Sequence, residues 1–280
     1  MPPYIPTTSS RAGRTLRMTN GTLCAVLLGA CAVSQQQEVA MGASSAAQVS
    51  AQLPLIRDAA VTSYIRSLGA QLANATDDRS LVWTFSVVDS KEVNAFALPG
   101  GWVYVNRGLI ERATEMSQLA GVMAHEIGHV TRRHSVQQLQ QAQQANAGVT
   151  LLCTLTKVCE SGASQAAINV GGTALFAKFS RTDESEADAE AVSTTVKAGI
   201  SPRGIPTMFR TLLSERQADP GAVMPFFATH PLEEDRIRAT EALIAKFPAR
   251  DISRLTPDTK AFQNFRRRLQ SLPPCSLRLR

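Results

Sequence analysis

Histidine is scarce in this chain: only 4 of its 280 residues are histidine, and three of those lie between positions 125 and 134. Aromatic residues are also few, at 5% of the sequence. Modules that read nucleic acid stack bases on aromatic side chains placed among basic ones, and the sequence contains no such module. We therefore expect no nucleic-acid partner, although the formal net charge is +6.

Long hydrophobic runs are absent as well. The longest apolar stretch, residues 148–179, is interrupted by cysteine, lysine, glutamate and glycine. It lacks the ~20 consecutive apolar residues of a transmembrane helix, so we expect it to belong to a soluble domain. A shorter run, TLCAVLLGAC at 22–31, follows three arginines. A basic segment before a short apolar run is typical of a signal peptide.

The end of that run, LGAC at 28–31, resembles the lipobox of a bacterial lipoprotein. The resemblance implies cleavage before Cys31 and lipidation of that residue, whose acyl chains anchor a protein without a transmembrane helix. Ala32 stands where an aspartate would retain an enterobacterial lipoprotein in the inner membrane, which favours the outer membrane of a Gram-negative bacterium, facing the periplasm. The alternative is an ordinary secretory signal peptide, and Met18 rather than Met1 could be the true start.

Cysteine is sparse, with 5 residues. No second pair of cysteines or histidines lies at ligand spacing, which argues against a zinc ribbon. In an oxidising compartment Cys153 and Cys159 could close the short loop CTLTKVC as a disulfide. Cys275 would then be free or would pair between chains.

Composition divides the chain into four segments. A Gln-, Ala- and Ser-rich stretch after Cys31 suits a tether, and the next 200 or so residues can bury the core of one domain. No internal repeat is visible, which argues against a tetratricopeptide array. The predicted segments are a signal peptide at 1–30, a tether at 31–50, a catalytic domain at 51–250 and a basic C-terminal tail at 251–280.

Hydrophobic spacing predicts a mostly helical domain with a few strands. Trp83, Phe85 and Val87 alternate with polar residues, as in a half-buried strand. A Pro-Gly-Gly turn at 99–101 joins two further short strands, which we expect to pair antiparallel. Thr114 is a good N-cap for the long helix that follows. Other helices are expected at 51–74, 183–198, 203–217 and 231–246.

His125, Glu126 and His129 form an HExxH pattern on that long helix. Residues four apart share a helical face, so the two histidines can bind one metal ion, while Glu126 lies beside a water molecule rather than on the metal. Zinc lowers the pKa of a water molecule that it binds, and the glutamate can take the proton and pass it to a leaving amine. The pattern indicates a hydrolytic zinc site; a polar helix face without metal is the alternative.

A catalytic zinc site needs a third protein ligand. The extended motif HExxHxxGxxH does not supply it, because Arg132 and Ser135 stand where that motif has glycine and histidine. The segment SRTDESEADAEAV at 180–192 places Glu184 and Asp188 four apart, hence on one helical face. Glu184 is therefore a candidate ligand, and an acidic first turn favoured by the helix dipole is the alternative.

Four ordered motifs together resemble a known family. They are NAFALPGGWVYV at 94–105, HEIGHVTRRH at 125–134, SRxxExxAD at 180–188 and THPxxxxRI at 229–237. This set is similar to the HtpX-like and CAAX-prenyl-protease-like zinc metallopeptidases, family forty-eight of the metallopeptidases, over about residues 50–247. Within it the chain resembles the small periplasmic lipoprotein branch, LoiP- and BepA-like, but without tetratricopeptide repeats. The fold implied is α+β: a mostly helical zincin-like domain with a small mixed or antiparallel sheet beside the HExxH helix.

The resemblance implies one zinc ion per chain, with His125, His129 and Glu184 as its ligands and Glu126 as the general base. Asp188 would be a carboxylate that holds a ligand histidine in orientation.

His230 would lie over the metal, where it either stabilises the oxyanion or occupies the open position at rest. A capped loop residue before a helix that begins at Pro231 is the alternative. Arg236 is expected to pair with an acidic group near the site, Asp188 being the candidate.

Main-chain contacts to an extended substrate are expected from Asn94 and Ala95, because VNAFALPGG fits an edge strand beside the cleft. Arg133 and His134 are expected on the surface of the helix rather than in the chemistry.

The function expected is that of a zinc-dependent endopeptidase, which degrades unfolded or misassembled proteins of the cell envelope. Its partners would be those polypeptides and, through the lipid anchor, the outer membrane. The alternative is a non-proteolytic chaperone or assembly factor for outer-membrane proteins with a silenced zinc site. An intact HExxH pattern disfavours it, since a structural zinc site is normally closed by four ligands and needs no glutamate base.

Overall fold

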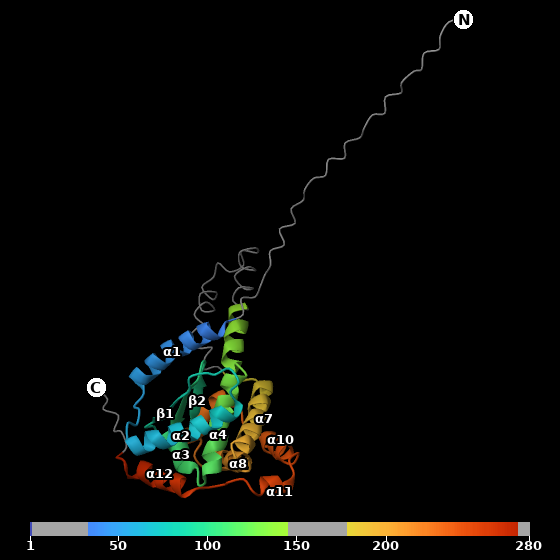
Figure 1. The fold of residues 1–280 in the computed structure, drawn as a ribbon. Coiled ribbons are helices and arrows are strands. Elements are labelled where there is room, and N and C mark those ends of the chain that lie inside the picture. Colours follow the sequence, from blue (N-terminus) through green and yellow to red (C-terminus); the bar gives the residue numbers. More distant parts are fainter. Residues whose placement is uncertain (2–32, 145–177, 274–280) are drawn as a thin grey trace. The chain divides into compact units, whose positions relative to one another are not determined.

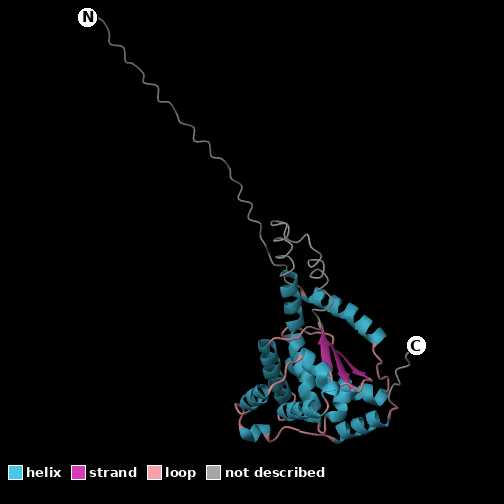
Figure 2. Cartoon of the chain, turned by 180° about the vertical axis from the view of Figure 1, so that it is seen from behind, coloured by secondary structure: helices cyan, strands magenta, loops and turns pink. Residues whose placement is uncertain are grey.

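The computed structural model of the chain describes residues 33–144 and 178–273, together with Met1. Cys31, Cys153, Cys159 and Cys275 lie outside these residues, as does the predicted signal peptide after Met1. Helices dominate the described part and accompany one small sheet (Figures 1 and 2), so the predicted α+β class is confirmed.

The described elements occur in the following order along the chain. Their bounds are α1 (Gln35–Gln52), α2 (Ala59–Thr76), β1 (Thr84–Val88), β2 (Ala95–Leu98), β3 (Trp102–Asn106), α3 (Arg107–Arg112), α4 (Met116–Thr131), α7 (Arg181–Lys197), α8 (Gly204–Ala218), α9 (Pro220–Thr229), α10 (Glu234–Ile244), α11 (Ala249–Ile252) and α12 (Lys260–Ser271). Residues 134–144, after α4, are also helical. No helix in the described ranges combines the length and hydropathy of a membrane span.

The sheet has the strand order β1-β3-β2 and is mixed. β3 pairs parallel with β1 and antiparallel with β2, in the register Ala95↔Val105. Gly100 and Gly101, with φ of 81° and 111°, turn the chain between β2 and β3, which confirms the predicted hairpin. In this part of the chain β2 is an edge strand.

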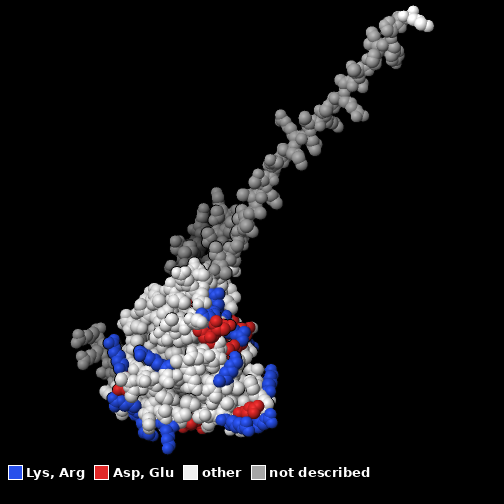
Figure 3. All heavy atoms as spheres, in the orientation of Figure 1, with Lys and Arg blue, Asp and Glu red and all other residues white. Residues whose placement is uncertain are grey.

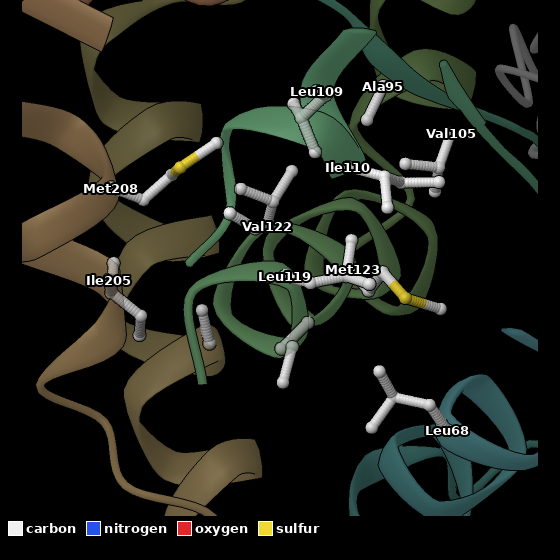
Figure 4. Close-up of a cluster of buried hydrophobic side chains, with 14 of the residues drawn as sticks. Leu68, Ala95, Val105, Leu109, Ile110, Leu119, Val122, Met123, Ile205 and Met208 are labelled. Atoms are coloured by element: carbon white, nitrogen blue, oxygen red, sulfur yellow. The ribbon is translucent and has the colours of Figure 1, made fainter. Parts of the chain in front are cut away.

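Helix α4 forms the centre of the hydrophobic core. All its residues from Met116 to Val130 are buried, because α2, α7, α8 and the sheet surround it. Figure 4 shows Leu119 and Met123 of α4 among side chains of α8, α2 and the sheet. Gly128 lets α7 approach closely, since a Cβ there would lie 3.3 Å from the Cα of Ala187. The HExxH segment is thus held on a helix that is packed on every side.

The start of α4 differs from the prediction. Its N-cap is Glu115, whose side chain makes no capping bond, rather than Thr114. The backbone N–H of Met116 instead donates to Asp258 Oδ1 at 3.0 Å. Thr114 donates through its own backbone N–H to Gln118 Oε1 at 2.7 Å. A cap supplied from more than a hundred residues away leaves no local sequence signal.

The segment expected to be a tether contains helix α1, which packs on the domain. Ser34 caps it in a reciprocal capping box with Gln37. Glu38 is fully buried and forms ion pairs with Arg79 and Arg133. Ala46 and Val49 also pack in a small apolar cluster with residues of the sheet. The order of this helix therefore comes from tertiary contacts, polar and apolar, rather than from propensity alone.

The predicted basic tail is also partly structured. Helix α12 buries Phe262, Phe265 and Leu269 at i, i+3 and i+7, and the ring of Tyr64 on α2 stacks on Phe265 with centroids 4.4 Å apart. In the sequence these apolar residues stand among outward-facing basic residues, so the stripe is hard to recognise from the sequence alone. On the face seen in Figure 3 basic side chains gather toward the lower edge and acidic ones form small groups.

Phe262→Ala tests whether α12 belongs to the folded domain. This side chain is fully buried, and Phe→Ala changes in a core cost about 3–5 kcal/mol. We expect a loss of that size in chemical denaturation, against less than about 0.5 kcal/mol for the exposed Lys260→Ala on the same helix. Equal stability of the two variants would show instead that α12 is a tail independent of the core.

Candidate metal centre

Three helices bring the histidine and carboxylate side chains together. His125 and His129 lie one turn apart on α4, and Glu184 lies on the facing side of α7. His230 is the C-cap residue of α9. These four side chains are each at most 2% exposed, so a polar cluster lies within the apolar core.

The donor atoms of this cluster converge on one point. The Nε2 atoms of His125 and His129 lie 3.0 Å apart, and they lie 3.5 and 3.4 Å, respectively, from the nearest oxygens of Glu184. Donors that share one tetrahedral zinc ion at 2.0–2.1 Å are separated by about 3.3 Å. The ligand atoms of the whole group, His230 included, lie within 4.8 Å of one another. The residues therefore fit a single small divalent ion with nitrogen and oxygen ligands.

One ring nitrogen of His230 lies beside this group of donor atoms, and the other ring nitrogen lies near Glu126. Its Nδ1 lies 3.0 Å from Glu184 Oε1 and 3.4 Å from His125 Nε2. Its Nε2 lies 3.4 Å from Glu126 Oε1. The ring stacks on Phe226 with centroids 5.1 Å apart. The next helix begins at Glu234 rather than three residues earlier.

A buried ion pair between Asp188 and Arg236 contacts His125 and Glu184 of this cluster. His125 Nδ1 lies 2.9 Å from Asp188 Oδ1. Arg236 donates to both oxygens of Asp188, at 2.8 and 2.7 Å, and also pairs with Glu184. One guanidinium thus compensates two buried carboxylates, and one of these carboxylates fixes the ring of His125.

The electrostatics separate the two glutamates. Burial would raise the pKa of Glu184, but hydrogen bonds from His125, His129 and His230 outweigh it and hold this pKa well below the ordinary range. Burial raises the pKa of Glu126 and is only partly offset by the neighbouring histidines. Glu184 is therefore a stable anion, whereas Glu126 binds a proton more readily than an exposed glutamate does.

The histidines differ as well. Burial would lower the pKa of His125, but its contacts with Asp188 and Glu184 raise that pKa to about 9. Burial lowers the pKa of His129, which keeps that ring neutral.

Two residues contact the site although the sequence did not predict it. His134, expected on the surface, is only 1% exposed, and its Nδ1 lies 2.9 Å from His129 Nδ1. Phe179 stacks on the ring of His129 with centroids 3.8 Å apart. The third histidine of HEIGHVTRRH could have suggested the first contact, but no local pattern marks Phe179.

The expected substrate-binding residues are only partly accessible. Ala95 is fully buried beneath the edge of the sheet, while Asn94 and Ala97 are half-buried. The backbone N–H of Asn106 donates to the carbonyl of Asn94 at 2.9 Å. Since hydrogen-bonded pairs alternate along antiparallel strands, Ala95 and Ala97 direct their backbone groups away from β3. Of these two, Ala97 is the one with exposed surface.

Comparison with known proteins gives one family and several relatives. Residues 57–244 match the description of peptidase family M48. The chain is 33% identical over 210 residues to the beta-barrel assembly-enhancing protease of Escherichia coli K12, covering 72% of this chain and 42% of that protein. The protein of that name from Yersinia pestis is 34% identical over 215 residues, covering 73% of this chain and 43% of the relative.

A third relative is the metalloprotease LoiP of Escherichia coli K12, 30% identical over 152 residues, with 54% of this chain and 59% of LoiP covered. This chain thus spans less than half the length of the two assembly-enhancing proteases.

Arg236→Met tests the supporting ion pair. It removes the guanidinium but keeps most of the side-chain volume, which leaves Asp188 and Glu184 without their cation. Breaking a buried pair in this way costs about 3–5 kcal/mol, measurable as a loss of unfolding free energy in the metal-free protein. The control is Arg238→Met, because Arg238 lies two residues further along the same helix and its side chain is exposed. This change should alter stability by less than about 0.5 kcal/mol. Similar small losses for both would contradict the pairing.

The raised pKa of His125 predicts proton release on metal binding. In the metal-free protein this ring carries an extra proton below about pH 9, and a metal ligand must be neutral. The affinity for a divalent metal should rise about tenfold per pH unit between neutral pH and that pKa, and fall as the pH drops. Calorimetry in two buffers of different ionisation enthalpy counts the protons, and no release at neutral pH would contradict this prediction.

Proposed function

This chain belongs to peptidase family M48, and on that premise we propose that it is a zinc-dependent endopeptidase acting on unfolded polypeptides. The observation that carries the proposal is the convergence of His125, His129 and Glu184 at the spacing of donors around one ion. Glu126 adjoins this group on the same helix. Two imidazoles, one carboxylate and a neighbouring free glutamate are the minimum set for metal-assisted hydrolysis.

His125, His129 and Glu184 would hold one zinc ion. When bound there, zinc supplies Lewis-acid chemistry that polarises a peptide carbonyl and makes water a stronger acid. Asp188 fixes the ring of His125 through Nδ1, so that Nε2 faces the ion. Arg236 keeps both carboxylates charged in the core. These contacts hold the ligands in one geometry before substrate arrives.

Glu126 would be the general base. Its Oε1 atom is buried and makes no hydrogen bond within the described residues, although His230 Nε2 lies 3.4 Å away. This oxygen would receive a proton from the attacking water. The raised pKa of Glu126 favours holding that proton until the leaving amine takes it.

An extended substrate would pair with the open edge of β2. Peptide groups that add to a sheet edge are recognised through the backbone, so side-chain identity matters little. We assign this contact to Ala97, because Ala95 is fully buried and the carbonyl of Asn94 already accepts from Asn106 of β3. Unfolded chains, which can present an extended segment, are the substrates that such an edge selects.

The cell envelope would be the compartment. The lipobox-like segment ending at Cys31 supports a lipid anchor in the outer membrane, facing the periplasm. Relatives named beta-barrel assembly-enhancing protease support substrates among outer-membrane proteins that have failed to assemble. Removal of such proteins would be a quality-control role.

His230 supports a second candidate function. Its Nδ1 lies among the metal donors, so the ring would be a fourth ligand at rest. A site closed by four ligands is typical of structural zinc. If the ring stays there, the protein would hold unfolded outer-membrane polypeptides as a chaperone or assembly factor without cleaving them.

Glu126→Gln and Glu184→Ala separate the proposed roles. Glu126→Gln should retain one zinc per chain and lose at least about a hundredfold in the rate of casein cleavage, because only the base is lost. Glu184→Ala should lose most of its zinc on dialysis, because one of three ligands is gone.

Two exposed or paired glutamates serve as controls for these variants. Glu241→Gln, on the surface of α10, should cleave like wild type, and Glu190→Ala, on the same helix as Glu184, should keep its zinc. Full zinc content in Glu184→Ala would remove that residue from the ligand set. Unimpaired cleavage by Glu126→Gln would show that Glu126 is not the general base.

His230→Ala distinguishes the two candidate functions. If the ring closes the site at rest, its removal should raise the initial rate of casein cleavage severalfold while zinc is retained. If the ring stabilises the oxyanion, kcat should fall by about a hundredfold with little change in KM. A variant and wild type that both bind zinc and both leave casein intact would support the chaperone.

A further inference from the structure

His134 contacts a metal-binding residue that a continuous helix would keep it away from. Successive residues of an α-helix are rotated by 100°, so positions five apart lie about 140° apart around the axis. His129 and His134 are five apart, yet their Nδ1 atoms lie 2.9 Å from each other. Both rings are buried. The chain must therefore bend between them.

The bend lies at Arg133. Helix α4 ends at Thr131, and Arg133 adopts φ of 62°, in the left-handed region that non-glycine residues rarely enter. Helix resumes at residue 134. Arg133 is held there by its ion pair with the fully buried Glu38, at 2.8 Å, and by a hydrogen bond to the carbonyl of Val33. Helix α1 thus stabilises the turn that points His134 back at His129.

The proton positions follow from the metal ligand. The Nε2 of His129 faces the other metal donors, so that atom must be bare, and the ring's single proton lies on Nδ1. His129 Nδ1 then donates to His134 Nδ1, which must be bare as well. The remaining proton of His134 lies on Nε2, which is 3.4 Å from the half-exposed Glu186 carboxylate.

We propose that His134 is a positioning residue for the metal centre: its bare Nδ1 accepts the Nδ1 proton of His129 and thereby fixes the tautomer and ring angle that direct His129 Nε2 to the ion. Phe179 stacks on the same ring and limits its rotation. This inference rests on the proposed function only in taking His129 as a metal ligand. It requires neither peptidase activity nor a particular substrate.

Two nearly isosteric substitutions test the hydrogen bond. In His134→Asn the side-chain Oδ1 occupies the place of Nδ1 and can still accept the proton, whereas in His134→Leu a methyl group stands there. Zinc affinity is measured by competition with a chromogenic chelator in the absence of substrate. His134→Leu should bind zinc at least tenfold more weakly than wild type, and His134→Asn should stay within about threefold. Glu186→Ala should also stay within about threefold, because its contact is long and half-exposed.

The outcomes separate this role from packing. Equal losses in the Asn and Leu variants, or wild-type affinity in the Leu variant, would overturn the proposal. Circular dichroism of the metal-free proteins shows whether both variants fold. Wild-type zinc affinity without casein cleavage would count against the proposed peptidase but not against His134, so the two failures are distinguishable.

A measurement on the unaltered protein covers the case in which a variant does not fold. The chain has only 4 histidines, so their ring nitrogens can be assigned by ¹⁵N NMR of the zinc-loaded protein. We expect a proton on His129 Nδ1, none on His134 Nδ1 and one on His134 Nε2. A proton on His134 Nδ1 at neutral pH would overturn the proposal.

Discussion

The site depends on the contact between the Glu184 carboxylate and the two histidines of α4. A carboxylate with 1% exposure is costly to bury unless cations and hydrogen-bond donors surround it. Here two imidazoles face it from α4, and Arg236 pairs with it from α10. Because α4 and α7 must approach closely for this contact, the position of Glu184 fixes how the two helices pack. The same approach brings the donors to the spacing of a single ion.

Around this contact, each histidine proposed as a metal ligand has its own support. Asp188 fixes His125, and His134 lies against His129. These supports come from parts of the chain far apart in sequence, since α1 holds the turn before His134 and α10 carries Arg236. If His134 positions His129 as proposed, the order of α1 affects the geometry of the centre, although α1 lies outside the segment that matches the family.

Features that depend on local residue spacing could be predicted from the sequence, whereas features that depend on contacts between distant segments could not. The HExxH pattern and the pair Glu184 and Asp188 follow from helical periodicity, and the Pro-Gly-Gly hairpin follows from turn chemistry, so these elements could be placed from sequence. The cap of α4 comes from Asp258, and the order of α1 comes from Glu38. The cap of α4 has no local signature, because a tertiary partner supplies it. Helix α1 has the capping box of Ser34 and Gln37 as a local signal, but its buried ion pairs leave no mark in the nearby sequence. His134 was missed for a related reason: helical periodicity assumes a straight helix, and a left-handed residue breaks it.

X-ray absorption at the zinc edge of the zinc-loaded protein tests the central claim most directly. The account predicts a shell of nitrogen and oxygen only, at about 2.0–2.1 Å, with outer-shell scattering from two imidazoles, or from three if His230 is bound at rest. A sulfur shell near 2.3 Å, or the absence of imidazole scattering, would contradict the assignment of His125, His129 and Glu184 to the metal.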